Sequence, residues 1–351
     1  MEKYYLKELC ELKELADSIK NTKMMSIAKI NAMIMLNMRY EPISIDSELD
    51  VHPYKLVNNL VIDAKNYLSQ MKEILFIEDS LPQNLTTCHT NQEEMHKKLF
   101  QKLWIDFTIE DYNKRIERYS YRLQINDLSD GFMKGFQCID FGCGHGNFAH
   151  AMLKNGASYI YGIDFGVDSI EYAINARDRL NVSSSSIMFK VESVYNVSKE
   201  NETFDFAVQN GVFHHLDDED SAYKEVWRVL KMKGLFWVYT DGAGSIKNDL
   251  WETSKYILKD IPDDFIISYL KYLNIETGKR YHLGDGMNAI YRYTTWDDIT
   301  SRLSDIGFGN FRRLIGGYPT DYDHDVIAKH KYGKEKFGEG NIRLLAQKIR
   351  S

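Results

Sequence analysis

Seven residues between a short apolar segment and a predicted helix have the composition of a ligand-binding turn. They read Asp140-Phe141-Gly142-Cys143-Gly144-His145-Gly146. Glycine tolerates backbone conformations that other residues avoid, and it has no side chain to keep a ligand at a distance. The N-terminus of the following helix adds backbone N–H groups that face the same space. The pattern predicts a small molecule bound against the backbone of this turn.

An acidic residue at the end of the next predicted strand has the position expected of a ribose ligand. Asp164 lies 22 residues after Gly142, and an acid about 20 residues beyond such a turn can accept hydrogen bonds from two ribose hydroxyls. The dinucleotide fingerprint needs a further glycine or alanine at position 147, where this chain has Asn147. We therefore expect a ribose-containing ligand other than NAD or FAD.

Two adjacent histidines, His214 and His215, follow the predicted strand Phe204–Gln209. Substrates of open α/β sheets lie beyond the carboxyl ends of the strands, which is where these side chains fall. Histidine can take up a proton near neutral pH, because its ordinary pKa is about 6.5. We expect His215 to be the catalytic base, with His214 as the second candidate. Alternatively, the pair shapes the pocket or caps the next helix.

Three arginines recur on one side of a helix predicted over 110–126, namely Arg115, Arg118 and Arg122. Such a stripe can hold the carboxylate or phosphate of a substrate. Alternatively, it is a solvated face whose charges are balanced by acids of the same helix. Those acids are Glu110, Asp111 and Glu117.

The elements that must position these residues alternate between strand and helix from Cys138 onward. The expected strands are Gln137–Phe141, Tyr159–Asp164, Ile187–Val191, Phe204–Gln209 and Leu235–Thr240. Helices are expected at Phe148–Leu153, Ser169–Leu180, Glu219–Leu230 and Trp296–Leu303, with a turn at Met232–Gly234. Asn310–Leu314 and Ile342–Ala346 are expected to close the sheet as an antiparallel pair. The fold class is therefore α/β, with a doubly wound, mostly parallel seven-stranded sheet.

The N-terminal region has a different periodicity. Apolar residues recur at three- and four-residue steps through residues 1–80, which predicts amphipathic helices without strands. We expect residues 1–90 to form a helical accessory region, joined by a linker over Glu78–Gln92, and residues 91–351 to form the catalytic domain. Residues 243–295 interrupt the alternation and are rich in aromatics, so they are expected to be a helical insertion that forms a lid over the acceptor or, alternatively, an ordinary small helical subdomain. The apolar faces of the N-terminal helices suggest that they pack on the core or on a second subunit, which would make a homo-oligomer.

Composition narrows the range of partners and locations. Acidic residues outnumber basic residues by 51 to 44, for a net charge of −7, which disfavours a nucleic-acid partner. No apolar stretch reaches membrane-spanning length, and charged residues interrupt the N-terminus where a signal peptide would be apolar. The four cysteines form no CxxC pair, which favours a reduced, cytoplasmic location. No acidic cluster suggests a metal site, so no metal is expected.

The segment from Gln137 to Gly242 resembles the class I S-adenosylmethionine-dependent methyltransferases, especially their small-molecule group. Four motifs carry the resemblance, in the family's order: Cys138–Gly146, Tyr161–Asp164, Phe204–Leu216 and Glu225–Gly234. Two positions depart from the family pattern. Ser193 stands where the third motif usually has an acid, and Met232-Lys233-Gly234 replaces the usual Pro-Gly turn.

The resemblance implies S-adenosylmethionine as the cofactor and a role for each matching residue. The first motif, with Phe141, Gly142, Cys143 and Gly144, would lie against the methionine part, mostly through backbone. Asp140 would hold the ammonium group. The other implied contacts are Asp164 to the ribose hydroxyls, Phe165 over the adenine, Ser193 and Val194 at the adenine edge, and Asn210 near the amino end.

The function implied is methyl transfer to an oxygen or nitrogen atom of a small molecule, such as a sugar or a secondary metabolite. Methyl transfer from a sulfonium is an in-line displacement, so the protein has mainly to align the reacting atoms. Two alternatives stay open at this point. One is a protein or peptide methyltransferase, and the other is a non-catalytic scaffold with the same fold.

Overall fold

The computed structural model describes residues 3–74, 109–129, 131–276, 280, 283 and 290–350. The chain divides into two compact units, a sheet unit and a helical unit, which are treated separately below. The predicted linker over Glu78–Gln92, and with it the predicted boundary at residue 90, lies outside the described residues.

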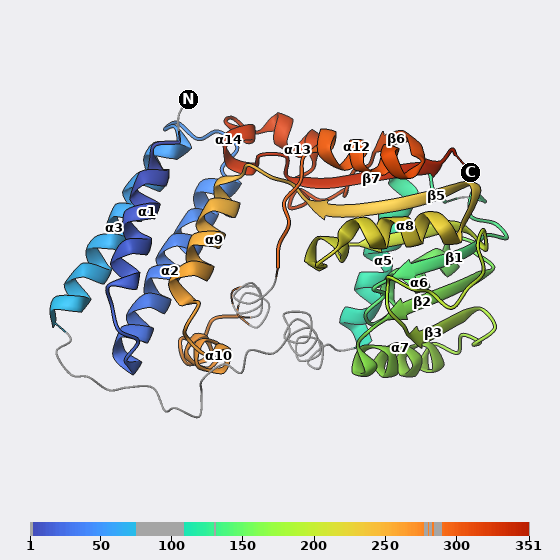
Figure 1. Ribbon diagram of the computed structural model, residues 1–351, viewed down its shortest axis with the longest axis horizontal. Helices are drawn as coiled ribbons and strands as arrows, with labels where there is room; N and C mark the ends of the chain where they lie inside the picture. Colours follow the sequence, from blue (N-terminus) through green and yellow to red (C-terminus); the bar gives the residue numbers. More distant parts are fainter. Residues whose placement is uncertain are drawn as a thin grey trace. The chain divides into compact units, whose positions relative to one another are not determined.

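The sheet unit is built on seven strands in the order β3-β2-β1-β4-β5-β7-β6 (Figure 1). The strands are β1 (Gln137–Phe141), β2 (Tyr159–Asp164), β3 (Ile187–Val191), β4 (Phe204–Asn210), β5 (Leu230–Asp241), β6 (Phe308–Arg313) and β7 (Asn341–Lys348). β1 to β5 are parallel, whereas β7 runs antiparallel to both β5 and β6. The predicted mostly parallel, seven-stranded fold is confirmed, including the closing antiparallel pair.

Helices cover both faces of this sheet. One face packs against α5 (Ile109–Ile125), α6 (Asn147–Lys154) and α7 (Val167–Arg179), and the other against α8 (Glu219–Val229) and α12 (Trp296–Ile306). Alternate residues of β1 point to the two layers, with Cys138 in the first core and Ile139 in the second. Because both faces are buried, the central strands are mostly apolar and do not alternate regularly with polar residues.

One predicted turn is wrong. Met232-Lys233-Gly234 lies inside β5, which begins at Leu230 and runs to Asp241. The chain bulges there, since Phe204 pairs with Leu230 while Phe206 pairs with Leu235. Lys233 takes the left-handed conformation that the bulge requires, with φ of 66°.

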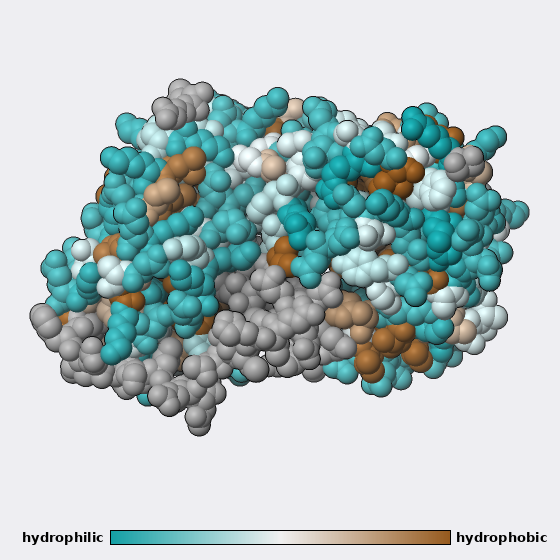
Figure 2. All heavy atoms as spheres, viewed as in Figure 1, coloured by the Kyte–Doolittle hydropathy of each residue, from teal (hydrophilic) through white to brown (hydrophobic). Residues whose placement is uncertain are grey.

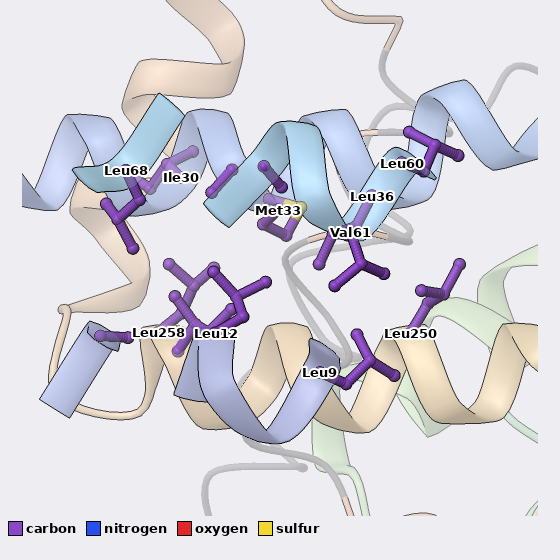
Figure 3. Close-up of a cluster of buried hydrophobic side chains, with 14 of the residues drawn as sticks. Leu9, Leu12, Ile30, Met33, Leu36, Leu60, Val61, Leu68, Leu250 and Leu258 are labelled. Carbon is purple, nitrogen blue, oxygen red and sulfur yellow. The ribbon is translucent and has the colours of Figure 1, made fainter. Parts of the chain in front are cut away.

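The helical unit combines three stretches of chain that are far apart in the sequence. Its helices are α1 (Tyr5–Asp17), α2 (Lys23–Ile45), α3 (Pro53–Ile74), α9 (Ile246–Leu258), α10 (Asp263–Tyr272) and α14 (Gly333–Phe337). Leu9 and Leu12 of α1, Met33 and Leu36 of α2, Val61 of α3 and Leu250 of α9 meet in one core (Figure 3). The helical character predicted for residues 1–80 is confirmed over the described residues 3–74.

The insertion after β5 therefore contributes α9 and α10 to this unit, where α9 packs on α1 and α2. Ser245 starts α9 with a capping box, in which its hydroxyl accepts from the N–H of Asn248 and the Asn248 side chain accepts from the Ser245 N–H. Such a cap satisfies two backbone donors that the helix itself cannot. The lid role of residues 243–295 remains a prediction.

The surface seen in Figure 2 is predominantly hydrophilic, with apolar side chains in small separate patches. Within the described ranges, the structure contains no helix that is both long enough and apolar enough to cross a membrane.

Candidate functional site

The glycine turn connects β1 to α6, and its three glycines have positive φ angles for different reasons. Gly142 has φ of 67°, and a Cβ there would lie 2.6 Å from Cγ1 of Val212. Gly146 is the N-cap of α6 with φ of 81°, and a Cβ there would collide with the ring of Phe189. These two glycines are therefore required by the protein's own packing.

Gly144 differs from its two neighbours. Its φ is 50°, yet no protein atom lies within 4 Å of the place where a Cβ would stand. The space beside Gly144 is open, at the point where the turn approaches the N-terminus of α6. An open space against a glycine backbone is what a closely bound ligand needs.

Asp164 at the end of β2 holds this turn in place. Its Oδ2 accepts a hydrogen bond of 3.0 Å from the N–H of Gly144, and its Oδ1 accepts one of 2.8 Å from the N–H of Gly166. The carboxylate therefore joins the loops that follow two adjacent parallel strands. The predicted ribose contact is a further role for the same side chain and remains a prediction.

Asp140 is buried in β1, with 2% of its surface exposed. Burial, reinforced by the charge of Asp164, raises the pKa of its carboxyl to about 8. Its Oδ2 has no hydrogen-bond partner among the described residues. A buried carboxyl oxygen without a partner fits a cationic ligand group such as an ammonium, which would supply both the hydrogen bond and the opposite charge.

The remaining predicted cofactor residues follow the same edge of the sheet. Phe165, directly after β2, is 40% exposed, and Ser193, shortly after β3, is exposed as well. Asn210 ends β4, where its Oδ1 accepts a 3.3 Å hydrogen bond from the indole N–H of Trp237. These residues stand at the carboxyl ends of parallel strands: β2 and β4 neighbour β1, and β3 lies beyond β2, so their positions follow one edge of the sheet.

Three predicted residues have side chains that face the protein interior. Phe141 is fully buried, with its ring 5.9 Å from the ring of Phe213, and Val194 is buried in the same core. Cys143 is 9% exposed, and burial raises the pKa of its thiol well above the ordinary value. Phe141 and Cys143 can therefore reach a ligand in the turn only through their backbone.

Gln209, which the sequence analysis did not single out, fixes the loop after β4. It is fully buried, and its Oε1 accepts hydrogen bonds from the N–H groups of Val212 (3.1 Å) and Phe213 (3.3 Å). Its amide nitrogen donates to the carbonyl of Tyr239 in β5, over 3.1 Å. A polar residue at the end of an otherwise apolar strand was the signal available in the sequence.

The two histidines stand in a single turn of 3-10 helix, η2 (Phe213–His215). His214 is buried, with its Nδ1 3.4 Å from the hydroxyl of Thr240, whereas His215 is half-buried. The ring of Tyr291 lies 4.6 Å from that of His215 and 5.9 Å from that of His214. His215 is therefore the more accessible of the two.

Arg292 holds this histidine turn from a distant part of the sequence. Its backbone N–H donates to the carbonyl of His214 (3.0 Å), and its guanidinium donates to the carbonyls of Leu216 (2.8 Å) and Asp217 (2.9 Å). These three contacts satisfy the free carbonyls at the end of η2. They also place the neighbouring Tyr291 against both histidine rings.

The arginine stripe of α5 is not the solvated face that one interpretation predicted. Arg122 is buried, and together with Arg118 it pairs with Asp321 instead of with acids of its own helix. Two acids of that helix pair with lysines instead, Glu110 with Lys114 and Glu117 with Lys154.

Within the described residues, no group of three His, Cys, Asp or Glu side chains is arranged to hold a metal ion.

Residues 139–238 match the protein family described as "Methyltransferase domain". The ubiquinone biosynthesis O-methyltransferase of Pelagibacter ubique is 29% identical over 136 residues, which are 38% of this chain and 54% of that protein. The protein of the same name from Bartonella bacilliformis is 25% identical over 192 residues, 52% of this chain and 73% of that one.

The chain thus spans between about half and three quarters of these relatives. Among solved structures, the YcgJ protein of Bacillus subtilis is 15% identical, covering 67% of this chain and 99% of its own, with a TM-score of 0.43. The match over residues 139–238, with the curated methyltransferases beside it, shows that this chain carries a domain of the class I S-adenosylmethionine-dependent methyltransferase family.

Proposed function

We propose that this protein transfers a methyl group from S-adenosylmethionine to an oxygen or nitrogen atom of a small molecule, such as a sugar or a secondary metabolite. Two features together carry the proposal. One is the open space beside Gly144, and the other is the carboxyl oxygen of Asp140 that has no hydrogen-bond partner among the described residues. A methionine moiety has the matching parts, a compact chain for the open space and an ammonium group for the carboxyl.

Other residues of the chain would bind the ribose and the adenine of the cofactor. Asp164 would bind the ribose hydroxyls, Phe165 would cover the adenine, and Ser193 and Val194 would contact its edge. Asn210 would face the amino end from β4. The exposed ring of Phe165 supports its part, because an aromatic side chain left 40% exposed beside the turn can stack on a base.

When bound, S-adenosylmethionine supplies an electrophilic methyl group. An alcohol is a poor nucleophile while it keeps its proton, so an oxygen acceptor needs a base, and His215 would accept that proton on its imidazole. His214 would support the turn from its buried position against Thr240. The two curated relatives named above are both O-methyltransferases, which favours oxygen as the acceptor atom.

Calorimetry with S-adenosylmethionine and its demethylated product, without added metal, tests the cofactor assignment. We expect both to bind, and tighter binding of NAD would overturn it. A labelled-methyl transfer screen on metabolite and protein fractions then tests the acceptor class. Label in small molecules supports the proposal, label in polypeptides supports the alternative of a protein or peptide methyltransferase, and binding without any transfer supports a scaffold.

Two further expectations belong with this proposal. A cytoplasmic location is supported by the free thiols of Cys10, Cys138 and Cys143. Homo-oligomer formation through the N-terminal helices has less support than the sequence suggested, because Tyr5, Leu9 and Leu12 are buried in the helical unit's own core. We expect no metal, no nucleic acid and no membrane among the partners.

A further inference from the structure

Three arginines from two elements of the sheet unit converge on one carboxylate oxygen. Oδ1 of Asp321 accepts from Nη2 of Arg118 (3.3 Å), from Nη2 of Arg122 (2.5 Å) and from Nη2 of Arg343 (3.1 Å). Arg118 and Arg122 belong to α5, whereas Arg343 belongs to β7. We call these four residues the arginine cluster.

The cluster is buried and its hydrogen bonds are incomplete. Arg122, Arg343 and Asp321 are each at most 5% exposed. Within the described part of the chain, Nε and Nη1 of Arg343 and Nε of Arg118 are buried without a hydrogen-bond partner, as is Oδ2 of Asp321. Each buried donor left unpaired costs about 1–3 kcal/mol, so three of them in one place require an explanation.

Charge is also unbalanced at this point, since three guanidinium groups face two carboxylates. The second acid, Asp323, acts on Arg343 through its charge, while its oxygens accept from the backbone N–H groups of Gly316 (2.8 Å) and Val326 (3.3 Å). Like charges that are held together in a buried place repel one another strongly, unless an anion neutralises them. The unpaired donors and the excess positive charge both call for an oxyanion.

The cluster lies next to the proposed acceptor region. Arg343 pairs with Tyr239 across β5 and β7, and its guanidinium stands 4.5 Å from the centre of the Tyr239 ring. The carbonyl of Tyr239 accepts from the N–H of Gly211 and from the side chain of Gln209, the two contacts that hold the loop before the histidine turn. A single residue of β5 thus separates the arginines from the loop that carries His214 and His215.

Solvent reaches the cluster through Arg118. The side chain of Arg118 is 43% exposed, and its guanidinium stands 4.7 Å from the centre of the Tyr318 ring. Both residues line an open hollow of about 820 Å³ along α5, and Arg118 is the member of the cluster that faces it.

We propose that Arg118, Arg122 and Arg343 bind an oxyanionic group of the acceptor, a carboxylate or a phosphate. The inference rests on the proposed methyl transfer and narrows its acceptor to an anionic small molecule. A guanidinium presents a planar fork of donors that matches these oxyanions, and two such forks with free N–H groups are present here. The anion would complete the bonds that Asp321, with one shared oxygen, leaves unmade.

The test uses the full-length protein and inorganic phosphate or acetate as the probe, with sodium chloride holding the ionic strength constant. Binding is measured by calorimetry for the parent chain and for Arg118→Gln, Arg343→Met and Arg179→Gln. Arg179 is the matched control, because it carries the same charged group, is exposed on α7 and donates from its Nε to the carbonyl of Asn175, outside the cluster and outside the hollow. Arg118 is the variant expected to fold normally, since its side chain is partly exposed.

We expect saturable binding of phosphate or acetate by the parent, at least tenfold weaker binding by Arg118→Gln and Arg343→Met, and no change in Arg179→Gln. Absence of binding by the parent, or equal weakening in all three variants, would overturn the site. A neutral acceptor identified in the methyl transfer screen would also overturn the inference while leaving the methyl transfer intact. Conversely, phosphate binding with this variant pattern but no binding of S-adenosylmethionine would refute the methyl transfer and leave the anion site standing.

Discussion

Oδ2 of Asp164 accepts a hydrogen bond from the backbone N–H of Gly144, and this contact joins the end of β2 to the turn after β1. The carboxylate that is predicted to bind ribose therefore also shapes the neighbouring turn. Loss of the side chain removes both contributions together.

Asp164→Ala should weaken the binding of S-adenosylmethionine by about 1.5–3 kcal/mol, the range of hydrogen bonds to a charged group. Calorimetry measures this loss directly. Asp168→Ala is the matched control, because Asp168 is an exposed acid in the first turn of α7, the helix that follows β2. If the Asp164 variant binds as tightly as the parent, the ribose role is wrong.

The glycines of the turn should respond differently to an added methyl group. Gly144→Ala places a Cβ in open space, where the cofactor is expected to bind. The variant should therefore bind the cofactor much more weakly than the parent, while its melting temperature changes little. Gly146→Ala drives a Cβ into the ring of Phe189, so it should lower the melting temperature. Gly131→Ala controls for backbone strain, because Gly131 also has positive φ and open surroundings. Equal binding losses at positions 131 and 144 would contradict a ligand at Gly144.

Asp140 should release a proton when the cofactor binds. With a pKa of about 8, this carboxyl is mainly protonated at pH 7 in the free protein, and a bound ammonium favours its ionised form. Calorimetry at pH 7 in two buffers of different ionisation enthalpy should show close to one proton released for each cofactor bound. Asp140→Asn should bind more weakly and release none; proton release that persists in this variant must come from another group.

The same carboxyl should make stability depend on pH. Its pKa in the folded chain is raised above the ordinary value of about 3.9, so the folded state holds a proton that the unfolded state has lost. Stability therefore falls as the pH rises from about 4 to about 8. Urea unfolding of the parent and of Asp140→Asn across this range should show a flatter dependence for the variant. If the free energies of unfolding of the two proteins changed in parallel with pH, the pKa of Asp140 would not be raised in the folded chain.

His215→Ala should leave cofactor affinity nearly unchanged and reduce turnover by roughly 10²–10⁴-fold, the contribution typical of a general base. His215→Asn keeps a polar side chain but cannot serve as the base, so it should be equally slow. Single-turnover rates with the labelled methyl group separate this effect from product release. Substantial activity in the Asn variant would show that His215 only shapes the pocket, as the alternative interpretation holds.

Deleting residues 1–75 should cause aggregation, because it strips α1, α2 and α3 from the apolar face of α9. Light scattering and dye binding measure the exposed surface. Leu12→Ala is a less severe change that tests the same core. Truncating a buried leucine in a packed core lowers the free energy of unfolding by about 2–5 kcal/mol. A monodisperse truncated chain with full activity would show that the helices are dispensable.

Much of the sheet unit could be predicted because its signals are local. The apolar strands, the glycine turn and Asp164 each follow from residues close together in the sequence, and the structure places the strands at nearly the predicted bounds. Arg292 and Tyr291 could not be assigned to the histidine turn, because their contacts join segments about 75 residues apart. The residues around an exposed arginine in the sequence do not show whether its side chain is solvated or, like that of Arg292, donates to carbonyls of a distant turn.

The bulge in β5 and the membership of α9 were missed for related reasons. Residues 230–234 have the composition of a turn, and β4 pairs with Leu230 before this stretch and with Leu235 after it. Residues 243–295 were expected to be an insertion, but their composition does not say which core its helices join. The arginine stripe was noticed from its spacing, whereas its partner Asp321 comes from a loop without a sequence signal.

The composition of the helical unit has a consequence for how the chain is made. α1, α2 and α3 leave the ribosome before the sheet, but α9, which packs on α1 and α2, follows only after β1 to β5 have been synthesised. At about 5–20 residues per second, that interval is on the order of ten seconds or longer. During it the nascent N-terminal helices expose an apolar face that has no intramolecular partner yet. Chaperone occupancy during translation should therefore be highest on this segment, and silent codons that slow the ribosome before residue 246 should lower the yield of folded protein.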